Sequence, residues 1–564
     1  MRDFRISGTY VPSPLVVMSL AVLVICGWPG MSVPIADASE TVPLFDNLGT
    51  LHHQITTTDP KAQQYFDQGL RLVYAFNHEE AIRAFEEAAR IDPDAAMAYW
   101  GIAYALGPNI NAPMDRQAER RGYEAIQKAK AHSEKATPQE RAYIDALATR
   151  YSVAPDADRK ALDQAYAEAM GKVAKQYPDD PDATTLAAEA RMDLRPWDYW
   201  SLGGQPHPGT MEIVESLDGV LKRHPQHIGA CHYYIHAVEA WQPERALPCA
   251  ERLPSLAPGA GHLVHMPSHI YIRVGKYDKA VERNAHAVSA DQHYLEGRHL
   301  TGVYPVGYYP HNIHFLWAAL TMQGRSGEAL QTSRDLMKAV SLDVVRQVPE
   351  LELTVPTPFV ALVRFGRWDD ILREPSPPAD LSYSVALWHY ARGMAFTAKG
   401  QLDHAKDEQA KLDQLADAMP AERMIGLNPA KTLLQIASRV LTGQMAARHG
   451  RTEEAIHHFE KAVVLQDRLR YYEPPDWYYP VRESLGAVLL SAGRAANAEA
   501  VYREDLKRTP ENPWSLYGLA RSLRAQHRDG EAATVEERFR RAWSKADNEF
   551  HLSRFEAFLA AQSR

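Results

Sequence analysis

Residues 62–93 read AQQYFDQGLRLVYAFNHEEAIRAFEEAARIDP. On both sides of Asn77 and His78, apolar and small residues recur three and four positions apart, which is the spacing of one helix face. The stretch therefore predicts a helix, a turn at Asn77-His78 and a second helix. Small residues, aromatic residues and a proline mark this unit at fixed offsets: Tyr65, Gly69, Ala81, Phe85, Ala88 and Pro93.

The same offsets recur along the chain. Ala246 and Ala280 are 34 residues apart, and so are Ala498 and Ala532. Self-similarity at a fixed period of this length is typical of solenoid architectures, in which each unit packs only on its neighbours. Further copies centre on residues 275–280, 400–405, 450–455 and 486–510, with a weaker copy at 324–329. The 564 residues are therefore interpreted as one array with insertions rather than several unrelated domains.

These repeats resemble the tetratricopeptide repeat (TPR), in which small residues let helices cross closely, an aromatic residue fills the gap and a proline closes the unit. The resemblance covers most of the chain after residue 60. It implies an all-α, right-handed superhelical solenoid of TPR-like helix-turn-helix repeats with irregular helical insertions. Residues 76–81, 107–111, 265–271 and 473–480 together resemble bacterial extracytoplasmic TPR proteins. A TPR array serves many purposes, so the resemblance implies a groove and leaves its contents open.

The N-terminus has the pattern of a secretory signal peptide. Arg2 and Arg5 precede an apolar run at residues 15–26, and Ala36-Asp37-Ala38 offers a cleavage site. The run is shorter than the roughly 20 residues that span a bilayer. We expect residues 1–38 to be removed and the protein to be periplasmic or extracellular. The alternative is an uncleaved segment that anchors the protein in the membrane.

Composition and periodicity divide the rest of the chain. We expect a linker at 39–60, N-terminal repeats with an irregular helical insertion at 61–226, a His-rich repeat segment at 227–340, C-terminal repeats at 341–549 and a tail at 550–564. With 45% hydrophobic and 24% charged residues, the chain can bury a large core. Its net charge of -9 provides no basic field for a phosphate backbone, which argues against nucleic acid as a partner.

Histidines are concentrated in the middle of the chain. Of the 24 His, 13 lie between His207 and His314. His232, His236 and Glu239 follow the spacing i, i+4, i+7, which places them within about 60° of one another around a helix. They therefore share one helix face.

The following repeats continue the pattern. His262, His265 and His269 are spaced i, i+3, i+7, and His311 and His314 are spaced i, i+3. In TPR proteins the second, fifth and ninth positions of the first helix line the concave groove. Counted back from Ala280 and from Ala329, these histidines fall on such positions. The resemblance therefore implies that several imidazoles face one groove.

Imidazoles with a carboxylate are ligands that zinc, iron and copper accept, and two histidines one turn apart can reach one ion. A metal site with open positions activates water or oxygen. The alternative is a polar groove whose histidines hydrogen-bond an anionic or peptide ligand. The chain has no His-Glu-x-x-His motif, which leaves both interpretations open. The candidate metal ligands are His232, His236, Glu239, His262, His265, His269, His311 and His314.

Other polar and aromatic clusters are candidates for ligand binding. Residues 196–200 form an aromatic loop, and residues 471–480 contain four Tyr and one Trp between two repeats. Turn chemistry and rings that fill gaps between helices are the structural alternatives. The candidates are His78, Asn109, Asn111, Trp197, Tyr271, Asp476, Trp477, Tyr478 and Arg482.

The sequence thus predicts an exported TPR protein that binds a peptide or small molecule in a His-rich and aromatic groove, together with a transition metal. The alternative is a metal-dependent enzyme, an oxidoreductase or hydrolase, with His232, His236, Glu239, His265 and His269 as its principal ligands. A third hypothesis is that the protein is a purely structural assembly factor. Motifs for nucleotide binding and for serine hydrolysis are absent from the sequence. Cleavage would leave two cysteines, Cys231 and Cys249, and the sequence leaves open whether they form a disulfide.

Overall fold

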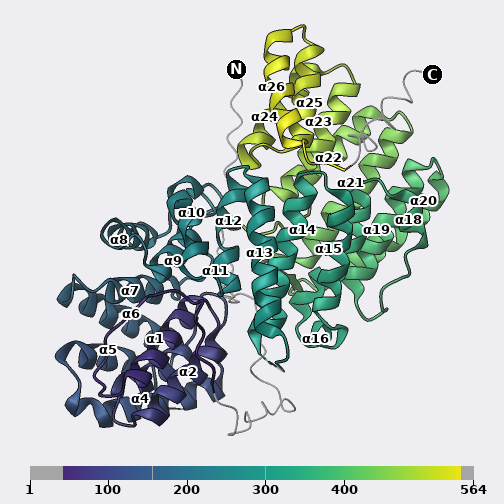
Figure 1. Ribbon diagram of the computed structural model, residues 1–564. Coiled ribbons are helices and arrows are strands. Elements are labelled where there is room, and N and C mark those ends of the chain that lie inside the picture. The colour runs from purple at the N-terminus through teal and green to yellow at the C-terminus, as the bar shows by residue number, and fades with distance from the viewer. Residues whose placement is uncertain (1–41, 155, 299, 301, 548–564) are drawn as a thin grey trace, which may run out of the picture.

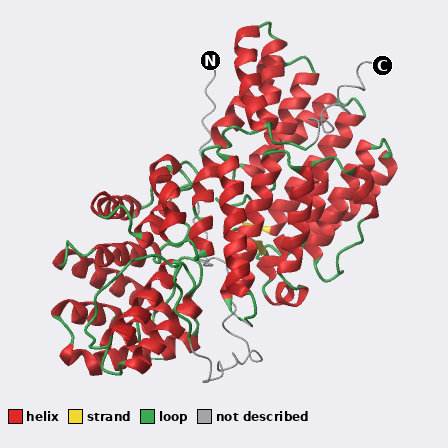
Figure 2. Ribbon diagram, in the orientation of Figure 1, coloured by secondary structure: helices red, strands yellow, loops and turns green. Residues whose placement is uncertain are grey.

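A computed structural model of the protein describes residues 42–547, except 155, 299 and 301. The expected signal segment, the first part of the linker and the C-terminal tail lie outside the described residues. Figure 2 shows that helices dominate this part of the chain. Among the described helices, none combines the length and apolar character that crossing a bilayer requires.

The N-terminal helices form the part of the array at the lower left of Figure 1. Each helix packs against the next one along the chain. Their bounds are α1 (Pro60–Tyr74), α2 (His78–Ile91), α3 (Ala96–Ala105), α4 (Arg116–His132), η1 (Ser133–Lys135), α5 (Pro138–Ala148), α6 (Arg159–Gln176), α7 (Pro181–Met192) and α8 (Thr210–Arg223).

The middle of the array carries the His-rich segment and contains several short or irregular elements. They are α9 (Ile228–Val238), η2 (Pro243–Ala246), α10 (Leu247–Leu256), α11 (Gly261–His265), α12 (Pro267–Arg273), α13 (Tyr277–Leu295), the π-helical turn η3 (Tyr304–Tyr308), α14 (Tyr309–Met322), α15 (Ser326–Ala339), α16 (Leu342–Gln347) and the 3₁₀-helix η4 (Pro349–Thr354).

The C-terminal helices continue the pairwise packing, and α24 to α26 lie at the top of Figure 1. The elements are α17 (Thr357–Arg364), α18 (Trp368–Arg373), α19 (Ser382–Ala398), α20 (Leu402–Ala418), the paired two-residue strands β1 (Met424–Ile425) and β2 (Asn428–Pro429), α21 (Ala430–Arg448), α22 (Thr452–Gln466), α23 (Val481–Ser491), α24 (Ala495–Arg508), α25 (Pro513–Arg524) and α26 (Asp529–Ala542).

The repeat residues fulfil the packing role that their offsets predict. Gly69 on α1 and Gly101 on α3 both face the ring of Phe85 on α2, and a Cβ atom at either glycine would lie 2.5 Å from that ring. Gly486 and Gly518 flank Tyr502 in the same way. Small residues therefore let successive helices approach one aromatic ring. The expected all-α array of TPR-like helix pairs is confirmed.

One predicted helix is divided in the structure. Only Met266 lies between α11 and α12, and Pro267 begins α12, because proline has no N–H to donate within a continuous helix. Met266 nevertheless keeps helical dihedral angles, with φ -49° and ψ -35°. The chain therefore continues in nearly the same direction, and the histidines on both sides of the break remain close together.

Candidate metal centre

Three imidazoles meet between α9 and α11. His232 and His236 lie one turn apart on α9, and His262 lies near the start of α11. The Nε2 atom of His232 lies 3.1 Å from the Nε2 atoms of both His236 and His262. All three side chains are buried. We call this group the first triad.

A second group of imidazoles lies beside the first. His265 ends α11, His269 lies on α12 and His311 comes from the first turn of α14, directly after the π-helical turn η3. The Nε2 atom of His269 lies 2.9 Å from Nε2 of His265 and 3.4 Å from Nε2 of His311. We call this group the second triad.

In the first triad, the Nδ1 atoms of His232 and His236 are hydrogen-bonded away from the meeting point, whereas Nδ1 of His262 has no hydrogen-bond partner among the described residues. Nδ1 of His232 lies 2.7 Å from the carbonyl oxygen of Tyr74, which can only accept, so this nitrogen donates. Nδ1 of His236 lies 3.3 Å from Oε1 of Glu239. A neutral imidazole with its proton on Nδ1 has a lone pair on Nε2. The Nε2 lone pairs of His232 and His236 therefore face each other.

The second triad is oriented by the same principle. Nδ1 of His265 lies 2.7 Å from Oδ1 of Asn284, whose amide nitrogen donates to the carbonyl of Ala280 and so fixes the amide orientation. Nδ1 of His269 lies 2.7 Å from Oε2 of Glu239 and 3.4 Å from Oε2 of Glu473. Carboxylate and amide oxygens behind histidines are the usual arrangement in metal sites, because they fix the ring and leave Nε2 free.

Burial and mutual repulsion keep most of these imidazoles neutral. Burial first, and the neighbouring imidazoles second, hold the pKa of His232 and of His262 well below the ordinary value. Burial opposes the charge of His269 as well, but the carboxylates of Glu239 and Glu473 outweigh it and raise the pKa of His269 to about 9. A metal ion at the second triad therefore competes with one proton.

Two buried carboxylates stand behind the triads. Burial opposes ionisation of Glu239, but the imidazoles of His269 and His236 outweigh burial and lower its pKa to about 2. Burial raises the pKa of Glu473, and neither of its carboxylate oxygens has a hydrogen-bond partner among the described residues. Glu239 is therefore the ionised carboxylate, and burial makes Glu473 the more readily protonated of the two.

The distances within each triad suit a transition metal. Two imidazole nitrogens that each lie 2.0–2.1 Å from one tetrahedral ion are about 3.3 Å apart. The three ligand nitrogens of each triad lie within 4.8 Å of one another, so each triad could hold a metal ion; only His311 among the six imidazoles is half-buried rather than buried. A third grouping of His236, Glu239 and His269 also satisfies this criterion. It consists of the Glu239 carboxylate and the two imidazoles that this carboxylate contacts.

Two aromatic residues with unusual backbone conformations enclose the first triad. The ring of Phe76 lies 4.4 Å from that of His232 and 5.4 Å from that of His262, and the ring of Trp197 lies 5.0 Å from that of His236. Phe76 has φ 57° and Trp197 has φ 58°. Bulky residues rarely adopt positive φ, and such strain is concentrated at functional sites.

Both triads open onto one cavity. His236 and His262 of the first triad line it, together with His269 and His311 of the second. Its volume is about 890 Å³, its open mouth included. The remaining wall is mostly aromatic and aliphatic, and it comes from Asn111, Trp197, Tyr308, Pro310, His314, Leu351, Leu353, Thr354, Tyr472 and Glu473, among others.

Several other candidates from the sequence lie at this cavity or close to it. Asn111 donates to the hydroxyl of Tyr308 and accepts from Nε1 of Trp197, so it holds both rings of the wall. His314 stacks on Trp317 and lies outside both triads, and burial lowers its pKa to about 4. His78 stacks on Phe76, behind the first triad.

The remaining candidates have structural contacts away from the cavity lining. The side chain of Asn109 accepts from the backbone of its own turn, at residues 111 and 112. The hydroxyl of Tyr271 donates to the carbonyl of Ala250. In the run at 471–480, the carboxylate of Asp476 accepts a hydrogen bond from Asn428. Trp477 packs on the ring of Tyr390, and Tyr478 contacts the hydroxyl of the same tyrosine. Arg482, just after the run, forms an ion pair with Asp467.

Sequence reasoning missed Glu473, Asn284 and the carbonyl of Tyr74. Glu473 is a carboxylate within an otherwise aromatic and proline-rich run, which is a signal that could have been used. Asn284 is a polar residue one turn after the repeat residue Ala280, on the buried side of α13. A backbone carbonyl such as that of Tyr74 has no sequence signal.

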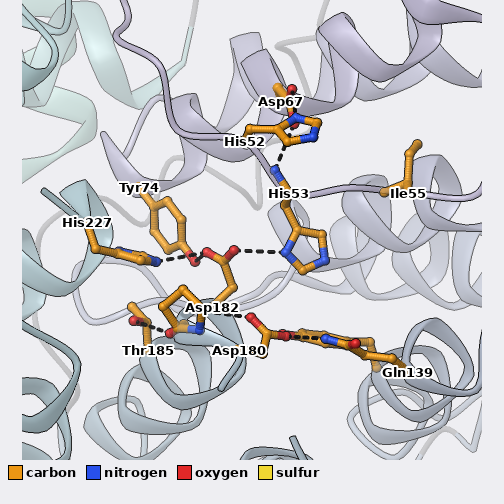
Figure 3. Close-up of polar contacts among 12 residues, drawn as sticks. His52, His53, Ile55, Asp67, Tyr74, Gln139, Asp180, Asp182, Thr185 and His227 are labelled. Carbon is orange, nitrogen blue, oxygen red and sulfur yellow. Dashed lines mark hydrogen bonds and ion pairs between the residues drawn. The ribbon is translucent and has the colours of Figure 1, made fainter. Parts of the chain in front are cut away.

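A separate polar cluster around Asp182 contacts His227, the residue that caps the start of α9 (Figure 3). Asp182 on α7 accepts from His53 at 2.8 Å, from His227 at 3.0 Å and from the hydroxyl of Tyr74 at 2.5 Å. His53, Asp180 and Asp182 also satisfy the distance criterion for a metal group. Asp180 already accepts from Gln139 and from a tyrosine hydroxyl, so we interpret this cluster as structural.

Comparisons with known proteins add little to this description. No protein-family model matches the chain, and no curated protein matches it. Among solved structures, the human IFIT1 dimer with m7Gppp-AAAA has a TM-score of 0.32 at 11% identity, over 88% of this chain and 92% of that chain. A monomeric IFIT1 mutant with Gppp-AAAA has a TM-score of 0.31 at 12% identity, over 86% and 91%. At these scores the likeness supports no inference about this chain.

Proposed function

We propose that the protein is exported, binds transition metal ions through its two buried triads and takes up a small molecule in the adjoining cavity. The observation that carries this proposal is the pair of Nε2 atoms of His232 and His236, which lie 3.1 Å apart. Both rings have an acceptor at Nδ1, so two lone pairs face each other. A cation between them turns this unfavourable contact into coordination.

The donor set favours particular metals. Neutral imidazole suits zinc, copper and iron, whereas the carboxylate and water oxygens preferred by magnesium and calcium are not the atoms that meet here. Glu239 lies at the Nδ1 side of the rings, where it orients His236 and His269 rather than replacing a ligand. We therefore expect zinc, copper or iron.

The cavity favours a small molecule over a peptide. Only about 90 Å³ of its interior is open to the centre of a water molecule, which is space for several waters or for a compact organic group rather than a peptide segment. Rings and aliphatic side chains such as Tyr308, Leu351 and Leu353 form much of its wall. The ligand is therefore expected to present mainly apolar surface, with any donor atom directed at the triads.

A metal-dependent enzyme is the second candidate. Three protein ligands for each ion leave a coordination position open, as in catalytic zinc sites. Both triads also contribute imidazoles to the cavity wall, so a substrate there would reach either ion. Glu473 lines the same cavity and is a group able to accept or donate a proton. An oxidoreductase or a hydrolase would fit these features.

The proposal is tested by metal analysis of protein purified without a histidine tag. After incubation with zinc, copper(I) or iron(II) and removal of excess metal, the wild-type protein is expected to retain metal. His236→Ala removes a ligand of the first triad and should lower the metal content. His314→Ala is the matched control, because this buried cavity histidine lies outside both triads. A folded wild-type protein that retains none of the three metals contradicts the proposal.

A further inference from the structure

We infer that the two triads hold a coupled pair of ions and that the side chain of Glu239 is the group that couples them. This inference rests on the proposed metal binding. One carboxylate oxygen of Glu239 serves each triad: Oε1 lies 3.3 Å from Nδ1 of His236, and Oε2 lies 2.7 Å from Nδ1 of His269. Glu239 is therefore a positioning residue for both sites at once.

Local structure places Glu239 where it can do this. It follows the last residue of α9 and keeps helical dihedral angles, with φ -55° and ψ -37°, so its side chain continues the face that carries His232 and His236. Only 1% of its surface is exposed. Arg273 donates to its backbone carbonyl and leaves the carboxylate to the two imidazoles. The carboxylate is thus directed away from solvent and between the two triads.

The two triads are close enough for their charges to interact. The rings of His236 and His269 have centroids 5.5 Å apart, and those of His262 and His265 are 5.7 Å apart. Two cations at this range, inside a protein where water screens little, repel each other strongly. A negative charge that contacts a ligand of each ion reduces this repulsion. Glu239 therefore makes double occupancy favourable.

A carboxylate behind a ligating histidine also strengthens that ligand, and its loss typically lowers metal affinity 10–100-fold. At most metal sites this effect concerns one ion. Here the same carboxylate stands behind one ligand of each triad, so one substitution is expected to weaken both sites. The second ion to bind should lose more affinity than the first, because it also meets the unscreened charge of the first.

Zinc titration in competition with a chromophoric chelator tests the inference on the full-length folded protein. We expect the wild-type protein to bind two zinc ions. His232→Ala, which affects only the first triad, and His311→Ala, which affects only the second, should each bind one. Glu239→Gln keeps the shape of the side chain and removes its charge. It should lower the affinity for the first zinc ion about 10-fold or more and increase the ratio between the dissociation constants of the second and the first ion.

Copper(II) loading gives an independent spectroscopic readout. Two copper ions this close should produce a dipole-broadened electron paramagnetic resonance signal, which the two single-triad variants should lack. Glu239→Gln that leaves both zinc affinities unchanged, or weakens only one, overturns the coupling. A single ion shared by all six histidines contradicts the inference that each triad holds its own ion. A wild-type protein that binds no metal refutes the proposed function itself and is recognised by that result alone.

Discussion

Replacement of His53 by Gln should remove much of the pH dependence of this protein's stability between about pH 6.5 and pH 9. His53 lies in the segment before α1, and its Nδ1 atom is 2.8 Å from Oδ2 of Asp182 on α7. Burial opposes the charge of the imidazole, but the hydrogen bond to Asp182 and the charge of that carboxylate outweigh burial. Together they raise the pKa of His53 to about 9.

The magnitude follows from linkage between protonation and folding. An increase from the ordinary value of 6.5 to about 9 corresponds to about 3 kcal/mol of unfolding free energy. Folding raises the pKa, so this stabilisation is complete below about pH 6.5 and is lost as the pH rises through 9. The contribution of Asp182 changes with pH in the opposite direction. Burial opposes its ionisation, but the hydrogen bonds from His227 and His53 outweigh burial and hold its pKa below the usual range, so its contribution is lost only in acid.

Urea unfolding of the wild type, His53→Gln and His52→Gln at about pH 6 and at about pH 9.5 measures this effect. His52 is the matched control, because it is the adjacent histidine and its side chain is 51% exposed. The wild type and His52→Gln should each lose about 3 kcal/mol more than His53→Gln between the two pH values. The pKa of His269 is also raised to about 9, and its contribution should be lost equally in all three proteins. An equal loss in all three proteins would refute the assignment of this pH dependence to His53.

Two further predictions concern buried contacts. Glu483→Gln should cost about 3–5 kcal/mol of unfolding free energy, because Arg364 lies fully buried against it and over the ring of Trp514, whereas loss of an exposed pair costs less than about 1 kcal/mol. Urea unfolding measures this, and a cost below about 1 kcal/mol would contradict it. The thiols of Cys231 and Cys249 are buried in contact with each other, so oxidation should join them. Alkylation of the unfolded, oxidised protein should then modify neither, and modification of both would contradict this pairing.

Local periodicity was sufficient to predict the repeats and the shared faces. The spacing of four residues between His232 and His236 placed both on one side of α9, as the structure has them. The division into two triads could not be predicted in this way. His262 and His265 are three residues apart, yet His262 meets a residue of α9 and His265 faces α12 and α14. Which neighbour each imidazole meets depends on how the helices cross.

The irregular segments were less predictable still. Residues 471–480 were expected to form either a ligand wall or a plug between helices, and the structure contains both arrangements. Tyr472 and Glu473 line the cavity, whereas Trp477 packs on Tyr390 of α19. Glu473 approaches His269 across more than 200 positions of sequence. A loop has no periodicity from which such a contact could be inferred, and only the packing of distant repeats defines it.

Anomalous diffraction from crystals of the zinc-loaded protein, recorded at the zinc absorption edge, tests the central claim most directly. The account predicts two anomalous peaks, one at each triad, about 2.0–2.1 Å from the Nε2 atoms of its three histidines. It also predicts that the carboxylate of Glu239 lies between the two sites without coordinating either ion. Loaded crystals with no peak at either triad, or with their main peak at the cluster of His53 and Asp182, would contradict the account.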